Sequence, residues 1–237
     1  MNLPLYWRDQ QQMSWAATVV ESGSGSVVLD ESAFYPGGGG QPADVGVLEW
    51  AGVFTRIDGV SGAGGLVPVE GDPVPPRGTP VVGRLDDVRR RSLMRTHSAL
   101  HVVCGVVYRD FGALVTGSAM EPLAGRLDFN LPDVPDGFKT ELERIVNEEV
   151  VRDRAIRSVI VRREDALAGS DVMRTARFLI PPEVEQVRII DVVGLDAQAD
   201  AGTHVASTRQ IGEVSIAKVE SKGKGFRRVR IVLTTED

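Results

Sequence analysis

The chain has 237 residues, of which 42% are hydrophobic and 25% charged, so it is long enough for one large or two small globular domains. Its single cysteine, Cys104, excludes an intrachain disulfide framework and a zinc site made of several cysteines from one chain. No apolar run reaches the roughly 20 residues of a membrane helix, and the first residues lack a signal-peptide pattern. We therefore expect a cytoplasmic protein with no membrane partner. The net charge of −6 argues at first against nucleic acid.

Residues 1–86 are predicted to form a small β-barrel-like domain. Short apolar runs alternate in this part with turns that are rich in glycine and proline, a pattern typical of an antiparallel barrel or sandwich. The runs cover residues 16–20, 27–29, 45–50, 53–57 and 81–85.

Residues 87–237 are predicted to form an α+β domain with a mainly antiparallel sheet, because helices and strands interleave there without a regular βαβ rhythm. Apolar periodicity predicts helices over 87–108 and 137–151, the second with Asp136 as its N-cap. A short helix near 163–169 is also expected. Strands are expected at 124–130, 156–161, 187–193, 212–219 and 226–234, and the last two should form a basic hairpin.

The three histidines are the strongest chemical signal. His97 and His101 stand four residues apart on the expected helix, so both rings project from one face and can share an ion. Asp200 and His204 repeat this spacing about 100 residues later. Together they offer four ligands of the kinds that Zn²⁺ accepts, although a lone histidine is more often a core or surface residue. We interpret Cys104, three residues after His101, as a small buried hydrophobe rather than a ligand.

Two familiar zinc chemistries are excluded by the sequence. Zincin proteases need H-E-x-x-H, but the residues between His97 and His101 are Ser98, Ala99 and Leu100. Zinc deaminases need H-x-E and P-C-x-x-C, and the sequence contains neither motif.

A run of four glycines marks a second candidate site. Gly37, Gly38, Gly39 and Gly40 are followed by Gln41 in the segment FYPGGGGQPAD. Such a run suits a loop where backbone N–H groups approach a ligand closely or where φ is positive, and the alternative is a flexible hairpin loop. The segment is not a P-loop, because G-x-x-x-x-G-K-[ST] is absent.

Basic residues concentrate in the segments 84–95 and 218–230, although the chain as a whole is acidic. Local basic patches can follow a phosphate backbone, and the alternative is that they are solvated faces. The candidates for binding a phosphate backbone are Arg89, Arg90, Arg91, Lys222, Lys224, Arg227 and Arg228.

Taken in order, five segments resemble the freestanding alanyl-tRNA editing proteins of the AlaX family, which are related to the editing domain of alanyl-tRNA synthetase. The segments are FYPGGGGQPAD, RRRSLMRTHSALH, GRLDF, GLDAQADAGTHVASTRQIG and KGKGFRRVRI, and they span nearly the whole chain. The resemblance is to the medium-length type, which carries a β-rich N-terminal domain and lacks the C-terminal extension of the longest members.

The resemblance implies a hydrolase that deacylates alanine tRNA mischarged with serine or glycine, with one Zn²⁺ per chain. It also implies that the Gly37–Gln41 loop handles the mischarged tRNA end. Gly202 and Thr203, beside His204, are candidates for contacting the substrate, and the alternative is that they only shape a turn. The metal is expected to activate water or to orient the terminal adenosine and amino acid. The oligomeric state stays open.

One position departs from the family pattern. Asp200 stands where the family usually has a cysteine, in C-G-G-T-H, and Ala201 replaces a glycine. Asp200 then either ligates the metal, supports three histidine ligands from outside, or marks a site that has lost its metal. The last case would leave a non-catalytic tRNA-binding protein. A further alternative for the function is a metal-dependent hydrolase of another small ester.

Overall fold

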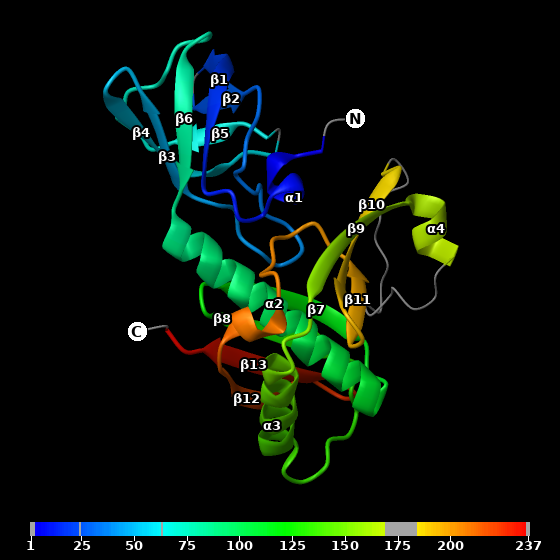
Figure 1. Cartoon of the computed structure of the whole chain (residues 1–237). Coiled ribbons are helices and arrows are strands. Elements are labelled where there is room, and N and C mark those ends of the chain that lie inside the picture. The colour runs from blue at the N-terminus through cyan, green and yellow to red at the C-terminus, as the bar shows by residue number, and fades with distance from the viewer. Residues whose placement is uncertain (1–2, 24, 63, 169–183, 236–237) are drawn as a thin grey trace. The chain divides into compact units, whose positions relative to one another are not determined.

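The computed structural model describes residues 3–23, 25–62, 64–168 and 184–235, which form two compact units (Figure 1). The first unit is Met1–Ser92 and the second is Leu93–Asp237. The α-helix α2 (Asp87–Phe111) starts in the first unit and runs on into the second. The predicted domain boundary at 86/87 falls at the start of this helix, whereas the two units divide at 92/93, and the boundary stays a prediction. Among the described residues, no helix has both the length and the hydropathy needed to cross a bilayer.

The first unit is a closed antiparallel barrel of six strands in the order β1-β2-β5-β4-β3-β6, which confirms the barrel-like fold. Its core contains Trp15, Leu48 and Ile57, all nearly inaccessible to solvent. A Cβ atom on Gly83 would lie 2.4 Å from the Trp15 ring, so only glycine leaves room for this indole beside the neighbouring strand. The elements are α1 (Leu5–Arg8), β1 (Ser14–Gly23), β2 (Ser26–Leu29), β3 (Gly46–Trp50), β4 (Val53–Val60), β5 (Leu66–Pro68) and β6 (Pro80–Leu85).

The second unit contains two antiparallel sheets, which confirms the predicted α+β class. One sheet has the order β12-β13-β8-β7, and the other has the order β11-β10-β9. The bounds of the strands are β7 (Val115–Glu121), β8 (Ala124–Phe129), β9 (Ile156–Arg162), β10 (Gln186–Val192), β11 (Asp196–Ala199), β12 (Val214–Ser221) and β13 (Arg227–Leu233). The helices after α2 are α3 (Phe138–Val151), α4 (Arg163–Ala168) and the 3₁₀ helix η2 (Thr208–Ile211).

The expected helices and strands of this unit are present, but two strands and one cap differ from the prediction. Strands β7 and β11 were not predicted, because β7 contains Gly117 and Ser118 and β11 is only four residues long. The N-cap of α3 is Gly137 rather than Asp136, since the chain enters the helix through a left-handed turn at φ 76°. Residue 169, the last of the predicted short helix, lies outside the described residues.

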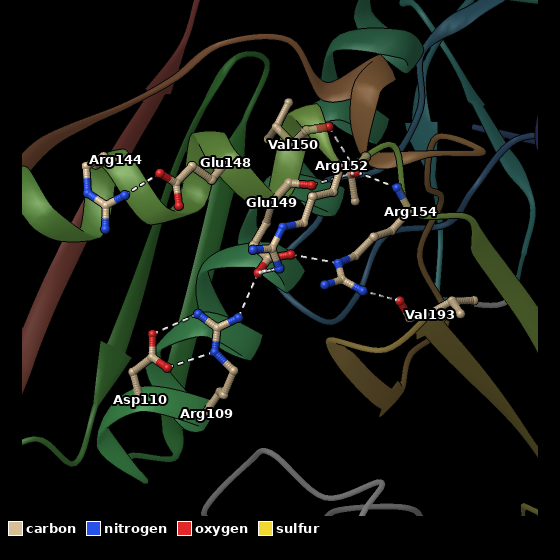
Figure 2. A network of polar contacts seen from close by, with 10 residues as sticks. Arg109, Asp110, Arg144, Glu148, Glu149, Val150, Arg152, Arg154 and Val193 are labelled. Atoms are coloured by element: carbon tan, nitrogen blue, oxygen red, sulfur yellow. Dashed lines mark hydrogen bonds and ion pairs between the residues drawn. The ribbon is translucent and has the colours of Figure 1, made fainter.

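A buried carboxylate ties several elements of the second unit together (Figure 2). Glu149, on α3, has a side chain that is 1% exposed and accepts hydrogen bonds from three arginines. The donor–acceptor distances are 2.7 Å to Arg109 Nη1, 2.9 Å to Arg152 Nη1 and 2.6 Å to Arg154 Nε. Arg154 also donates to the carbonyl oxygen of Val193, just after β10. The network therefore fixes the C-terminal end of α2 and the start of the β10–β11 turn relative to α3.

Candidate metal centre

Four side chains converge in the second unit, and all four were predicted as ligands. Helix α2 supplies His97 and His101, whose rings lie one turn apart, and the loop after β11 supplies Asp200 and His204. One potential ligand atom from each residue lies within 4.8 Å of the others. The three histidines are at most 5% exposed, and 14% of the Asp200 side chain is exposed.

The spacing suits a tetrahedral ion. Ligand atoms about 2.1 Å from a tetrahedral Zn²⁺ lie about 3.4 Å from one another. The observed distances are 3.3 Å between His97 Nε2 and Asp200 Oδ2, and 3.8 Å between His204 Nε2 and Asp200 Oδ1. Three imidazoles and one carboxylate are also a donor set that Zn²⁺ accepts. These residues therefore fit a metal ion without large rearrangement.

At Asp200 and His204, the electrostatics favour the protonation states that metal ligands need. Burial opposes ionisation of Asp200, but the neighbouring His97 and the other two histidines outweigh it and hold the pKa of this carboxyl well below its usual range. Burial and the nearby His97 and His101 lower the pKa of His204. Asp200 is therefore a carboxylate and His204 a neutral imidazole near neutral pH, which are the forms that bind a metal.

A second carboxylate, Asp196, orients one of the histidines. It is 3% exposed, and its Oδ2 lies 3.0 Å from His101 Nδ1, which leaves the Nε2 of that ring for an ion. Burial lowers the pKa of His101, but the hydrogen bond and charge of Asp196 outweigh it and raise this pKa. Gln198 Nε2 donates to Asp196 Oδ2 at 2.7 Å and to Cys104 Sγ at 3.2 Å. A carboxylate behind a histidine is a common arrangement at metal sites.

The sequence analysis missed Asp196 and Gln198, although a signal was present. Asp196, Gln198 and Asp200 alternate along β11 and just beyond it, and alternate residues of a strand share one face. The same analysis did not single out Gly105. A Cβ atom there would lie 2.9 Å from Asp196 Cβ and from Leu195 Cγ, so this glycine allows the hairpin to approach α2 closely.

The loop between Asp200 and His204 is held by hydrogen bonds from Arg188 and by one hydrogen bond within the loop. Arg188, which is 2% exposed, donates from Nη1 to the carbonyl oxygen of Gly202 at 2.7 Å and to that of Asp200 at 3.3 Å. The Gly202 N–H in turn donates to Asp200 Oδ1 at 2.6 Å. Thr203 is fully buried. Gly202 therefore shapes the turn that presents Asp200, and contact of Gly202 or Thr203 with a substrate remains a prediction.

The glycine run forms an ordered turn in the first unit. Gly37, Gly38, Gly39 and Gly40 all have positive φ angles, between 58° and 128°, which explains why side chains are absent from all four positions. Gly38 pairs with Gln41 in an isolated bridge, and the Tyr35 hydroxyl donates to the Gly38 carbonyl oxygen at 3.1 Å. Because the loop and the four candidate ligands belong to different units, its part in the site stays a prediction.

The structure removes one candidate from the basic track and limits another. Arg90 is fully buried and forms an ion pair with Asp44, which follows the glycine loop, so its guanidinium has no surface to offer RNA. Arg228 binds Asp128 through two hydrogen bonds of 2.6 and 2.8 Å, and only 14% of its side chain is exposed. The remaining candidates are Arg89, Arg91, Lys222, Lys224 and Arg227, which are exposed or partly exposed.

Comparison with known proteins assigns the family. The family described as "Threonyl and Alanyl tRNA synthetase second additional domain" matches residues 187–230, which include Asp196, Asp200 and His204. An alanine–tRNA ligase of Korarchaeum cryptofilum is 33% identical over 95% of this chain, but the match covers 25% of the ligase.

Two freestanding relatives match over nearly their whole length. The alanyl-tRNA editing protein AlaX-M of Saccharolobus solfataricus is 35% identical over 97% of this chain and 98% of the relative. The protein of the same name from Methanosarcina barkeri is 31% identical over 98% of this chain and 99% of the relative. With identity at this level along nearly the full length of both relatives, the chain belongs to the AlaX-M family of alanyl-tRNA editing proteins.

Proposed function

We propose that the chain is an aminoacyl-tRNA deacylase that hydrolyses the ester between serine or glycine and alanine tRNA. The observation that carries the proposal is the cluster of His97, His101, Asp200 and His204, with ligand atoms within 4.8 Å of one another, in a member of this family. We assign one Zn²⁺ to the cluster. Editing is needed because a small synthetic pocket separates serine or glycine from alanine only weakly.

The reaction is the addition of water to the ester carbonyl carbon. The bond between this carbon and the ribose oxygen then breaks, which releases the free amino acid and leaves a hydroxyl on the terminal adenosine. Because four protein ligands leave a tetrahedral ion no open position for water, a bound zinc ion would act by orienting the terminal adenosine and the amino acid. Arg188 supports the ligand loop from within the core, and Asp196 fixes the orientation of the His101 ring.

We assign Asp200 as the fourth ligand rather than as a supporting residue. Its carboxylate faces His97 and His204 at distances close to a tetrahedral edge, as described above. Like a cysteine thiolate, it carries one negative charge, so the net charge of the ligand set is the same as in a site with three histidines and one cysteine. A carboxylate is the harder ligand, and the change therefore alters metal affinity or preference.

The remaining parts of the proposal concern the tRNA. The Gly37–Gln41 loop is assigned to handling of the charged 3′ end, because the family resemblance implies this role. Gly202 and Thr203 are assigned to the same role, because they lie just before His204 in the chain. Arg89, Arg91, Lys222, Lys224 and Arg227 are assigned to the phosphate backbone, which a few cations can bind without reading sequence.

Deacylation of alanine tRNA charged with serine, glycine or alanine tests the proposal. Purified protein should hydrolyse the serine or glycine ester and spare the alanine ester, and His204→Ala should abolish this turnover. Asp165→Ala, an exposed acidic position on α4 in the same unit, is the matched control and should keep full activity. Binding of tRNA without turnover would favour a non-catalytic tRNA-binding protein. Turnover of other esters but not of charged tRNA would favour a different hydrolase.

A further inference from the structure

The face of the β12-β13-β8-β7 sheet that points away from α2 carries an unusual charge pattern. The inner face is defined by Gly125, where a Cβ atom would lie 3.2 Å from Thr96 and from Leu100 of α2. Val229 and Ile231, on the neighbouring strand, are buried on the same side. Because side chains alternate along a strand, the side chains of Arg126 and Arg230 emerge on the outer face.

The strand register aligns three cations in one row across this outer face. Lys218 of β12 lies directly opposite Arg230 of β13, and Arg230 lies directly opposite Arg126 of β8. Their side chains are 63%, 44% and 31% exposed. Like charges directly opposite each other on neighbouring strands destabilise a sheet, so this cation row, Lys218–Arg230–Arg126, works against the fold unless anions compensate it.

Compensation inside the protein is incomplete. Glu220 pairs with both Lys218 and Arg230, at 2.8 and 2.9 Å. Asp128 pairs with Arg126 at 3.1 Å, but it also binds Arg228 and lies 3.6 Å from Lys222 Nζ. The five cations thus share two carboxylates. With Glu121, which the register places on the same face, five cations stand against three carboxylates, and the surface keeps an excess of positive charge.

A hollow borders the cation row on the side away from these carboxylates. It measures about 350 Å³, within the usual range for ligand sites, and is lined by both the row and small side chains. The charged residues of its lining are Arg126, Arg230 and Glu121, and Ala119, Ala124 and Ala217 leave the space open. A phosphate held by the arginines would therefore have room beside it for an attached sugar.

We propose that this outer face binds the sugar–phosphate backbone of the tRNA, with phosphates on the cation row and a ribose over the hollow. The proposal rests on the proposed function, because it takes the substrate to be a tRNA. Strands lie about 4.8 Å apart, so three cations extend over about 10 Å, which is more than one phosphate needs. The face lies across the sheet from α2, which carries His97 and His101, and so it meets RNA away from the ester.

The double variant Lys218→Gln/Arg230→Gln tests the site. The affinity for uncharged alanine tRNA is measured by filter binding over a range of KCl concentrations. The slope of log K against log [KCl] is negative, and loss of two phosphate contacts should reduce its magnitude by about 2. Binding at low salt should also weaken. The matched control is Arg157→Gln/Arg162→Gln, which removes two exposed charges from β9 in the other sheet. Circular dichroism verifies that both variants are folded.

Two readouts separate this proposal from the proposed function. Because uncharged tRNA binds without turnover, a reduced slope supports the cation row even if the chain deacylates nothing. In the deacylation assay, kcat/KM should fall for serine-charged tRNA and stay unchanged for 3′-seryl-adenosine, which has no backbone to bind. An unchanged slope, or an equal loss in the β9 control, would overturn the proposal while leaving deacylation intact.

Discussion

Glu149→Gln removes the charge at the centre of the network in Figure 2 and preserves the side-chain volume. Oε1 accepts from Arg109 and Arg152, and Oε2 accepts from Arg154, so an amide must turn its NH₂ group toward at least one guanidinium. The Arg154 side chain is 21% exposed and would keep a largely buried charge without its partner. Breaking a buried pair costs about 3–5 kcal/mol.

We expect the lower end of that range, about 3 kcal/mol, because the side chains of Arg109 and Arg152 are 41% and 54% exposed and can regain water. For a chain of this length, this corresponds to a fall of about 6–12 °C in the melting temperature. Far-UV circular dichroism is the suitable probe, because α2 and α3 dominate the helical signal. Tryptophan fluorescence would instead report on the first unit, where Trp7, Trp15 and Trp50 lie.

Glu148→Gln is the control. The Glu148 side chain is 50% exposed and pairs with Arg144 on the surface of the same helix (Figure 2). Such an exposed pair contributes at most about 1 kcal/mol. Equal destabilisation in the two variants would refute the assignment of Glu149 as the organising residue of this unit.

The same variant makes a prediction about pH. Burial raises the pKa of Glu149, but the hydrogen bonds from Arg154 and Arg109 and the charges of Arg154 and Arg152 outweigh it and lower this pKa. A lowered folded-state pKa stabilises the fold above the unfolded value of about 4.3, and this stabilisation is lost as the pH falls through the folded value. The stability difference between the unmodified chain and Glu149→Gln should therefore be full at pH 7 and shrink below about pH 4. A difference that stays constant to pH 2 would contradict this reasoning.

Three further substitutions test the surroundings of the metal. Asp196→Asn should weaken zinc binding about 10–100-fold in a competition with a chelator, because the carboxylate behind His101 is neutralised; an unchanged affinity would remove Asp196 from the site. Cys104→Ala should keep the full metal content, since Cys104 Sγ accepts a hydrogen bond from Gln198 and is not among the four clustered ligands; metal loss would make the thiol a ligand. Gly105→Ala should lower zinc affinity without unfolding the chain, because the added methyl group pushes Asp196 away from α2; gain of helix stability with unchanged affinity would show that the contact relaxes elsewhere.

Periodicity and spacing were sufficient to predict most of the fold and the four candidate ligands. The apolar pattern of α2 fixed its start, and the two i, i+4 pairs on α2 and after β11 point at one another as expected. The spacing within each pair is local and can be recognised in the sequence without knowledge of the tertiary structure, whereas the meeting of the two pairs was inferred from the ligand chemistry that they share.

The features that were missed depend on contacts between distant segments. Asp196 reaches His101 across 95 residues, and Arg90 reaches Asp44 across 46. The charge of Arg90 suggested a surface position, but a buried carboxylate partner overrode this tendency. The cation row was hidden only in part: Lys218 and Arg230 belong to the predicted basic hairpin, but Arg126 becomes their neighbour only through strand register.

The central claim is that three histidines and Asp200 hold one zinc ion. X-ray absorption at the zinc edge of the purified protein tests it directly, because ligand distances distinguish nitrogen and oxygen from sulfur. We expect about one zinc per chain, with four nitrogen or oxygen ligands at about 2.0–2.2 Å and no sulfur, and Asp200→Cys should introduce one sulfur at about 2.3 Å. Sulfur in the unmodified protein, or a purified chain that retains no zinc, would contradict the account.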